Sequence, residues 1–277
     1  MKRTVWLWII AFILTLLTAA YQRVTGPTYP ISGKVNIDGK VISYSFDRSH
    51  AGNGDHLIKI KTDENDISGL LQWKRFKTSD DWESNSLVYK EGFLTGTLPH
   101  QPPAGKLMYK ITLEKNEKLF PLNDGHPVVI RFKGDVPAFI IIPHVILMFL
   151  AMMLSARAGL EFFNYKPDYK KLVYWTFVIL ILGGMILGPI MQKYAFGEFW
   201  TGVPFGIDLT DNKTLLAVIG WIIALAALKK SAKPQRWVIF ASIFMFIIYL
   251  IPHSVLGSEL DYNELDKQQN KIEQGIE

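Results

Sequence analysis

Hydrophobic and polar positions divide the chain into long apolar runs, an alternating middle portion and an acidic end. The longest apolar run covers residues 136–156, VPAFIIIPHVILMFLAMMLSA, and has no acidic or basic side chain if His144 is counted as neutral. A helix of this length extends about 31 Å, which is enough to cross the hydrocarbon core of a bilayer. The run therefore predicts a transmembrane helix.

Four further apolar runs predict four further membrane helices, at residues 5–20, 172–190, 215–228 and 237–256. The first run follows Lys2 and Arg3 and ends in small residues, which is typical of a secretory signal. Aromatic residues at both of its ends also fit an uncleaved anchor whose N-terminus lies inside. Both interpretations deliver the following segment to the outside.

Residues 25–135 alternate between apolar and polar positions in short runs separated by turn residues. Asp38-Gly39 is a two-residue hairpin signal. The clearest strand is 106–114, in which Leu107, Tyr109, Ile111 and Leu113 share one face. About seven to nine such strands predict a β-sandwich.

Trp73 in LLQWKRF and Tyr109 in GKLMYKI give this portion a resemblance to immunoglobulin and fibronectin type III domains. The resemblance implies that both side chains are core residues. The chain lacks cysteine, so the disulfide of antibody domains is missing and the fibronectin-like branch is favoured. Such domains bind partners far more often than they catalyse reactions.

Basic residues predict how the helices are oriented. The segments assigned to the inside carry ten of them: Lys2, Arg3, Arg157, Lys166, Lys170, Lys171, Lys229, Lys230, Lys233 and Arg236. The short outer loop carries only Lys193 and Lys213. Since loops rich in lysine and arginine stay in the cytoplasm, we expect the sandwich and the acidic tail outside. This pattern accounts for much of the net charge of +5, so no nucleic-acid partner is expected.

The predicted fold class is thus a multi-pass α-helical membrane protein with an extracytoplasmic all-β sandwich domain. Its parts are an N-terminal anchor or signal (1–24), the sandwich (25–135), a four-helix membrane domain (136–257) and an outer tail (258–277).

The tripeptide Ile-Pro-His occurs twice, ending at His144 and at His253. In the predicted topology these residues lie about 12 Å and about 6 Å below the outer surface. Met148 follows His144 by four residues and Met245 precedes His253 by eight, so the four side chains could converge. Imidazole and thioether groups suit haem b iron or copper. A pair of hydrogen-bonded structural histidines, or a role with protons or quinones, is the alternative.

Two further sets of ionisable residues are candidates. Arg157 and Glu161 are four residues apart and so share one helix face. They are either a buried ion pair that shapes a pocket or a positive-inside anchor with a surface partner. The acidic residues on the outer side could line a cation site or contact the sandwich: Glu198, Asp208, Asp211, Glu259 and Asp261. Helix capping is the alternative for Asp208 and Asp211. The sandwich histidines, His50, His56, His100 and His126, are expected at the surface.

No known catalytic motif is found, so an enzyme has no positive support. The first hypothesis is a binding or assembly protein, held in membrane lipid, whose outer domain contacts a protein partner. The alternative is a redox or metal-handling subunit of a bacterial inner membrane that binds haem b or copper through His144 and His253.

Overall fold

A computed structural model describes residues 2–253 and 255–274 of the chain. The chain divides into two compact units. The helical unit contains Met1–Pro27 and Val136–Ser258, and the β unit contains Thr28–Asp135 and Glu259–Glu277.

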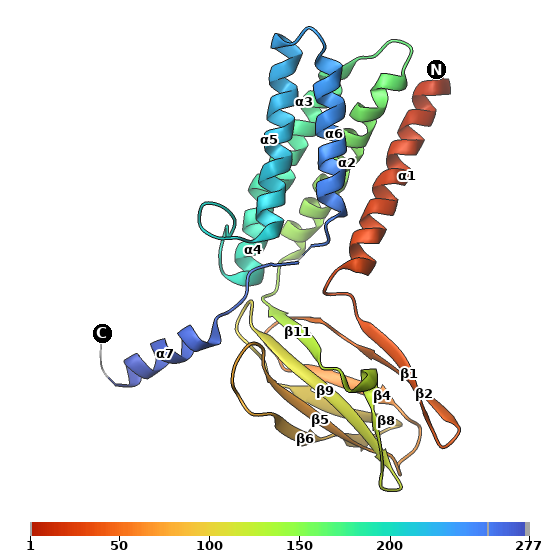
Figure 1. Cartoon of the computed structure of the whole chain (residues 1–277), viewed down its shortest axis with the longest axis vertical. Helices are drawn as coiled ribbons and strands as arrows, with labels where there is room; N and C mark the ends of the chain where they lie inside the picture. Colours follow the sequence, from red (N-terminus) through yellow and green to blue (C-terminus); the bar gives the residue numbers. More distant parts are fainter. Residues whose placement is uncertain (1, 254, 275–277) are drawn as a thin grey trace. The chain divides into compact units, whose positions relative to one another are not determined.

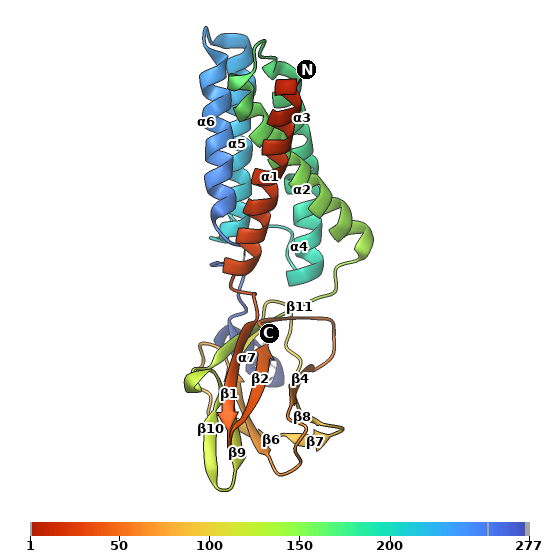
Figure 2. The same ribbon diagram turned by 90° about the vertical axis from the view of Figure 1, so that its right-hand side faces the viewer.

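The helical unit is an antiparallel bundle in which successive helices run in opposite directions, except that α4 continues in the direction of α3 (Figure 1). Its helices are α1 (Lys2–Thr25), α2 (Ala138–Leu160), α3 (Tyr169–Leu180), α4 (Gly188–Phe196), α5 (Leu209–Lys230) and α6 (Pro234–Leu250). A 3-10 turn, η2 (Glu161–Phe163), ends α2, and a π-helical segment, η3 (Ile181–Leu187), joins α3 to α4. Helix α2 packs against α1, α3 and α6 (Figure 2).

Within the described residues, four helical segments are long and apolar enough to cross a membrane: Arg3–Thr25, Ala138–Phe163, Tyr169–Phe196 and Leu209–Lys230. The span predicted at residues 172–190 covers Tyr169–Phe196 in the structure, because η3 continues α3 into α4. The predicted span at 237–256 is shorter, and α6 ends at Leu250. Ile251 is extended there because the proline that follows it disfavours helical geometry.

Small residues let the central helices approach one another closely. A Cβ atom on Gly184 would lie 2.8 Å from Thr214 Cγ2, and one on Gly183 would lie 3.1 Å from Met148 Sδ. Trp221 is fully buried between the helices, and its Nε1 donates to Met245 Sδ at 3.1 Å. Because no hydrophobic effect drives helices together in lipid, this close packing supplies the cohesion of the bundle.

The β unit has eleven strands in its described part. They are β1 (Ile31–Ile37), β2 (Lys40–Phe46), β3 (Ser49–Ala51), β4 (His56–Lys61), β5 (Ser68–Arg75), β6 (Glu83–Ser86), β7 (Val88–Lys90), β8 (Phe93–Leu98), β9 (Lys106–Lys115), β10 (Lys118–Pro121) and β11 (Val128–Lys133). A 3-10 turn, η1 (Leu122–Gly125), precedes β11.

These strands form three sheets, which give a β-sandwich-like domain. The largest has the order β3-β11-β9-β5-β6, with β10 also paired to β9. The others are β4-β8-β7 and the hairpin β1-β2. All pairs are antiparallel except β3 with β11. The hairpin predicted at Asp38-Gly39 is confirmed, with positive φ at both residues as this turn requires.

The core of the β unit contains the predicted face of β9, since Leu107, Tyr109, Ile111 and Leu113 are all buried. Tyr109 also donates its hydroxyl to the Asp47 carbonyl at 2.9 Å. Trp73 is only half-buried and packs at the margin of this core. Of the two side chains behind the fibronectin-like resemblance, therefore, only the tyrosine is central. The surface prediction for His56 is wrong, since this side chain is buried.

A C-terminal helix packs onto the β unit. Tyr262, the first residue of helix α7 (Tyr262–Glu273), is buried and donates to Gln101 Oε1 at 2.9 Å. Arg75 donates to both carboxylate oxygens of Asp266, at 2.7 and 2.8 Å, and to those of Asp80, at 2.6 and 3.0 Å. The same guanidinium lies over the Tyr262 ring, 5.1 Å from its centroid. These contacts make Arg75 the centre of the α7 interface.

Loss of Arg75 is expected to free α7. In Arg75→Gln the bidentate pair with Asp266 and the contact with Tyr262 are both lost, so we expect a nitroxide at Gln269→Cys to become mobile. Electron paramagnetic resonance line shape measures this change. The matched control is Lys90→Gln, an exposed cation of β7, which should leave the spectrum unchanged. An immobile label in Arg75→Gln would contradict the assignment.

Acid should release the same helix. The hydrogen bonds from Arg75 lower the pKa of Asp80 and of Asp266 below the usual value of about 3.9. Since both carboxylates have depressed folded-state pKa values, their contribution is complete above about pH 4 and is lost as pH falls below it. The Gln269 label should therefore stay immobile from pH 8 to about 5 and gain mobility between about pH 4 and 2. Release already above pH 5 would argue against this ion pair as the cause.

Candidate functional site

Hydrogen-bonded polar side chains, four of which are buried, gather at one end of the helical unit. This is the end where α1 and α6 end and α2 and α5 begin (Figure 1). We call this group the polar cluster. Its members are Gln22, His144, Gln192, Thr201, Asp208, Asp211, Lys213, His253 and Ser258. Polar groups inside a helical bundle mark either a binding site or a structural network, and their hydrogen bonds distinguish the two.

His144 follows Pro143 in α2 and bonds to the π-helical segment. Its Nδ1 lies 2.9 Å from the Gly183 carbonyl oxygen, which also accepts the Gly188 amide. Because a carbonyl only accepts, His144 Nδ1 carries the proton and Nε2 has the free lone pair. The sequence placed His144 at this depth, but it gave no sign of the π segment that supplies its partner.

His253 has a cation for its neighbour. Lys213 Nζ lies 3.0 Å from His253 Nδ1 and donates to the Ile251 carbonyl at 2.8 Å. Gln22 at the end of α1 donates to the same carbonyl, at 3.3 Å, and to that of Tyr249. Lys213 and Gln22 therefore satisfy backbone acceptors that the end of α6 leaves free.

Sequence reasoning missed Lys213 as a site residue, treating it only as a loop charge. The signal was present, because Lys213 follows the predicted cap Asp208 by five residues and so falls inside the helix. The side chain is only 3% exposed. A buried lysine in a membrane helix needs acceptors, and Ile251 and His253 provide them.

The four residues predicted to hold haem b or copper make separate contacts. Met245 Sδ accepts from Trp221, and Met148 Sδ lies 3.9 Å from the Tyr249 hydroxyl. His253 accepts from the Lys213 ammonium at Nδ1, which puts its own proton on Nε2. In the part of the chain that the structure describes, no three His, Asp or Glu side chains are grouped to hold a metal ion. The Lys213 ammonium beside His253 and the contacts of both thioethers with Trp221 and Tyr249 do not fit a haem or a copper site.

Asp208 and Asp211 act as hydrogen-bond acceptors at the start of α5. Asp208 caps the helix by accepting from Thr210 and Asp211, and it accepts from the Ser258 amide at 2.7 Å. Asp211 Oδ2 accepts from the amides of Thr201 and Gly202, at 2.7 and 3.0 Å. These bonds tie two segments to α5: the loop of residues 197–208, which we call the aromatic loop, and the segment after α6.

Two further acidic candidates are Glu198 and Glu259. Glu198 is exposed, and Glu259 belongs to the β unit, where it pairs with Lys106 at 2.7 Å and with Lys77 at 3.1 Å. Partial burial favours a higher pKa for Glu259, but hydrogen bonds from these lysines outweigh it and lower the pKa overall. Asp208 thus caps a helix, Asp211 accepts from loop amides, and Glu259 pairs with lysines of its own unit, while Glu198 is exposed.

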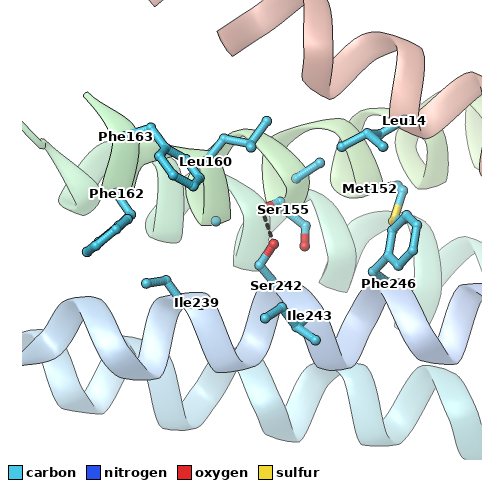
Figure 3. A pocket seen from close by; sticks show the side chains of 12 residues that line it. Leu14, Met152, Ser155, Leu160, Phe162, Phe163, Ile239, Ser242, Ile243 and Phe246 are labelled. Carbon is cyan, nitrogen blue, oxygen red and sulfur yellow. Dashed lines mark hydrogen bonds between the residues drawn. The ribbon is translucent and has the colours of Figure 1, made fainter.

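Arg157 and Glu161 form an ion pair with both side chains buried, at the opposite end of the bundle from the polar cluster. The Arg157 guanidinium lies 5.4 Å from the Trp8 ring centroid. Beside this pair lies an apolar groove of about 510 Å³ between α1, α2 and α6. Figure 3 shows its lining, in which the hydroxyls of Ser155 and Ser242 are the polar groups.

Replacing Asp211 should destabilise the bundle. In Asp211→Ala the buried amides of Thr201 and Gly202 lose their acceptor, at about 1–3 kcal/mol for each unpaired group. We expect a lower thermal midpoint for the full chain in detergent, measured by circular dichroism. Glu198→Ala, which removes an exposed carboxylate from the same loop, is the control and should leave the midpoint unchanged. Equal midpoints for the two variants would refute this structural role.

Comparisons with known proteins give no match for this chain. No family model matches the sequence, and neither the curated proteins nor the solved structures contain a match.

Proposed function

We propose that this protein is a multi-pass protein of a bacterial inner membrane that presents its β unit on the extracytoplasmic side to bind a protein partner. The helical unit serves as the anchor, and the polar cluster fixes the ends of its helices. This proposal keeps the first hypothesis from the sequence and rests on three features of the chain.

The contact of α7 with the β unit carries the proposal. Because α7 packs on the β unit, both parts must lie on the same side of the membrane. A chain that leaves one side and returns to it crosses an even number of times. Between residues 135 and 259 lie α2, the α3–α4 segment, α5 and α6, so parity requires α6 to cross as well. With 17 residues α6 is about 25 Å long, at the short end of the range for a membrane helix.

The distribution of charge supports the orientation. The connection from α2 to α3 contains Lys166, and the connection from α5 to α6 contains Lys233, each among other basic residues. Both connections lie at the end of the bundle where α1 begins (Figure 2). By the positive-inside rule this end faces the cytoplasm, which leaves the β unit outside.

An open sheet edge supports partner binding by the β unit. Strand β7 is the edge of the β4-β8-β7 sheet, and it exposes Val88 and Tyr89 to solvent. An edge strand has unpaired amide and carbonyl groups, so an extended segment of another protein can add to it as a further strand. The apolar side chains give such a partner additional contact area.

The alternative, a haem b or copper subunit, has no comparable support. Lys213 places a positive charge beside His253, and both methionine thioethers have other partners. An absorption spectrum and metal analysis of the purified protein test it directly. A Soret band or stoichiometric copper that disappears in His144→Ala would favour the alternative over a purely anchoring bundle.

The proposed topology predicts where single cysteines will react. Since the chain contains no cysteine, Gln269→Cys in α7 and Lys166→Cys in the α2–α3 connection each give one reactive site. A membrane-impermeant maleimide applied to spheroplasts should label Gln269→Cys, and Lys166→Cys only after the membrane is opened. Labelling of both sites, or of Lys166→Cys alone, would overturn the topology.

A further inference from the structure

The β unit contains two histidines that face each other across a tight loop. His50 lies in β3, His56 begins β4, and residues 51–55 connect them. Gly52 adopts a positive φ of 97°, and its amide donates to the Lys133 carbonyl at 3.2 Å. This glycine lets the loop fold back tightly, and the fold brings the two imidazoles together.

From this arrangement we propose that His50 and His56 bind a divalent transition-metal ion through their Nδ1 atoms. The two atoms are 3.3 Å apart, and the ring centroids are 5.1 Å apart with planes inclined at 69°. Two nitrogen ligands at about 2.0–2.1 Å from a tetrahedral ion lie about 3.3–3.4 Å from each other. The existing spacing is therefore that of a chelate, and binding requires little movement of either ring.

The hydrogen bonds of His50 prepare it as a ligand. Its Nε2 lies 2.9 Å from the Gly54 carbonyl oxygen and so carries the proton. Nδ1 consequently has the free lone pair that points to His56. A ring N–H held by a backbone carbonyl is the common second contact of metal-binding histidines, because it fixes both the tautomer and the ring orientation.

His56 completes the pair as a neutral ring. Burial, and secondly the neighbouring His50, lower the pKa of His56. Without metal its Nδ1–H donates to His50 Nδ1, and on binding this proton moves to Nε2, so the pair releases no net proton. His56 also lines a cavity of about 160 Å³ together with Asp47 and Lys59.

The remaining coordination positions fall to water, because the described residues hold no group of three protein ligands around an ion. Asp47 is within electrostatic range of His56, so its carboxylate favours a cation at this position. Two imidazoles and water suit Zn²⁺, Cu²⁺ or Ni²⁺. With open positions the ion would be exchangeable, which is typical of sites that pass on a metal or present it to an external ligand.

Titration of the full chain with copper tests the proposal. Chelator-treated protein in detergent is titrated with Cu²⁺, and its electron paramagnetic resonance spectrum is recorded. We expect one equivalent of Cu²⁺ to bind, with superhyperfine splitting of its spectrum by two ligand nitrogens. Affinity should fall at least about tenfold in His50→Ala and in His56→Gln, as for loss of a metal contact.

Two controls make the result specific. His126→Ala removes an exposed histidine of the same unit, and His144→Ala removes one of the histidine pair in the helical unit; both should bind copper as the unchanged chain does. Circular dichroism verifies that His56→Gln is folded, and His50→Ala, at a partly exposed ring, gives a second reading. No stoichiometric binding, or binding lost only in His144→Ala, would overturn the proposal.

Discussion

The structure of the helical unit depends on one constraint: every backbone amide and carbonyl that a helix end leaves free must find a partner away from water. The polar cluster meets this constraint with side chains from several elements. Asp211 accepts from two amides of the aromatic loop, while Lys213 and Gln22 donate to carbonyls at the end of α6. These bonds hold together elements that are distant in sequence and that have little regular structure of their own.

The same constraint explains why the histidines of the bundle do not resemble a cofactor site. His144 donates to a carbonyl of the π-helical segment, and His253 accepts from Lys213. His144 thus satisfies a carbonyl of a helix irregularity, and His253 accepts from the lysine that satisfies the Ile251 carbonyl. Charged and polar residues in a membrane segment frequently mark a site. Here their partners are found within the bundle, which favours a structural role.

Histidine plays a different role in the β unit, although the residue is the same. His50 and His56 are both held by a short loop, and their Nδ1 atoms face each other at 3.3 Å. The contrast with His253 lies in the neighbour: an ammonium group repels a metal ion, whereas Asp47 attracts it. Two pairs of histidines in one chain therefore differ in chemistry through the charge placed beside them.

Local sequence determined the parts of this protein that depend on local physics. Long apolar runs identified the membrane-length helices, Asp38-Gly39 identified a hairpin, and alternation identified the buried face of β9. Each of these follows from helix or strand periodicity or from the conformation of a turn, which neighbouring residues specify. The sequence predicted Asp208 as a helix cap for the same reason.

Only the tertiary structure decided which distant groups meet. Arg75 and Asp266 are separated by 191 positions, and the pairing that docks α7 has no local signature. His50 and His56 face each other because of the backbone conformation of Gly52 and the hydrogen bond to the Gly54 carbonyl. Lys213 is buried where it can donate to a carbonyl at the end of α6. Such contacts arise from the packing of whole elements. Spacing along the chain therefore suggested that Met148 and Met245 lie near the histidines, but it did not predict their contacts with Tyr249 and Trp221.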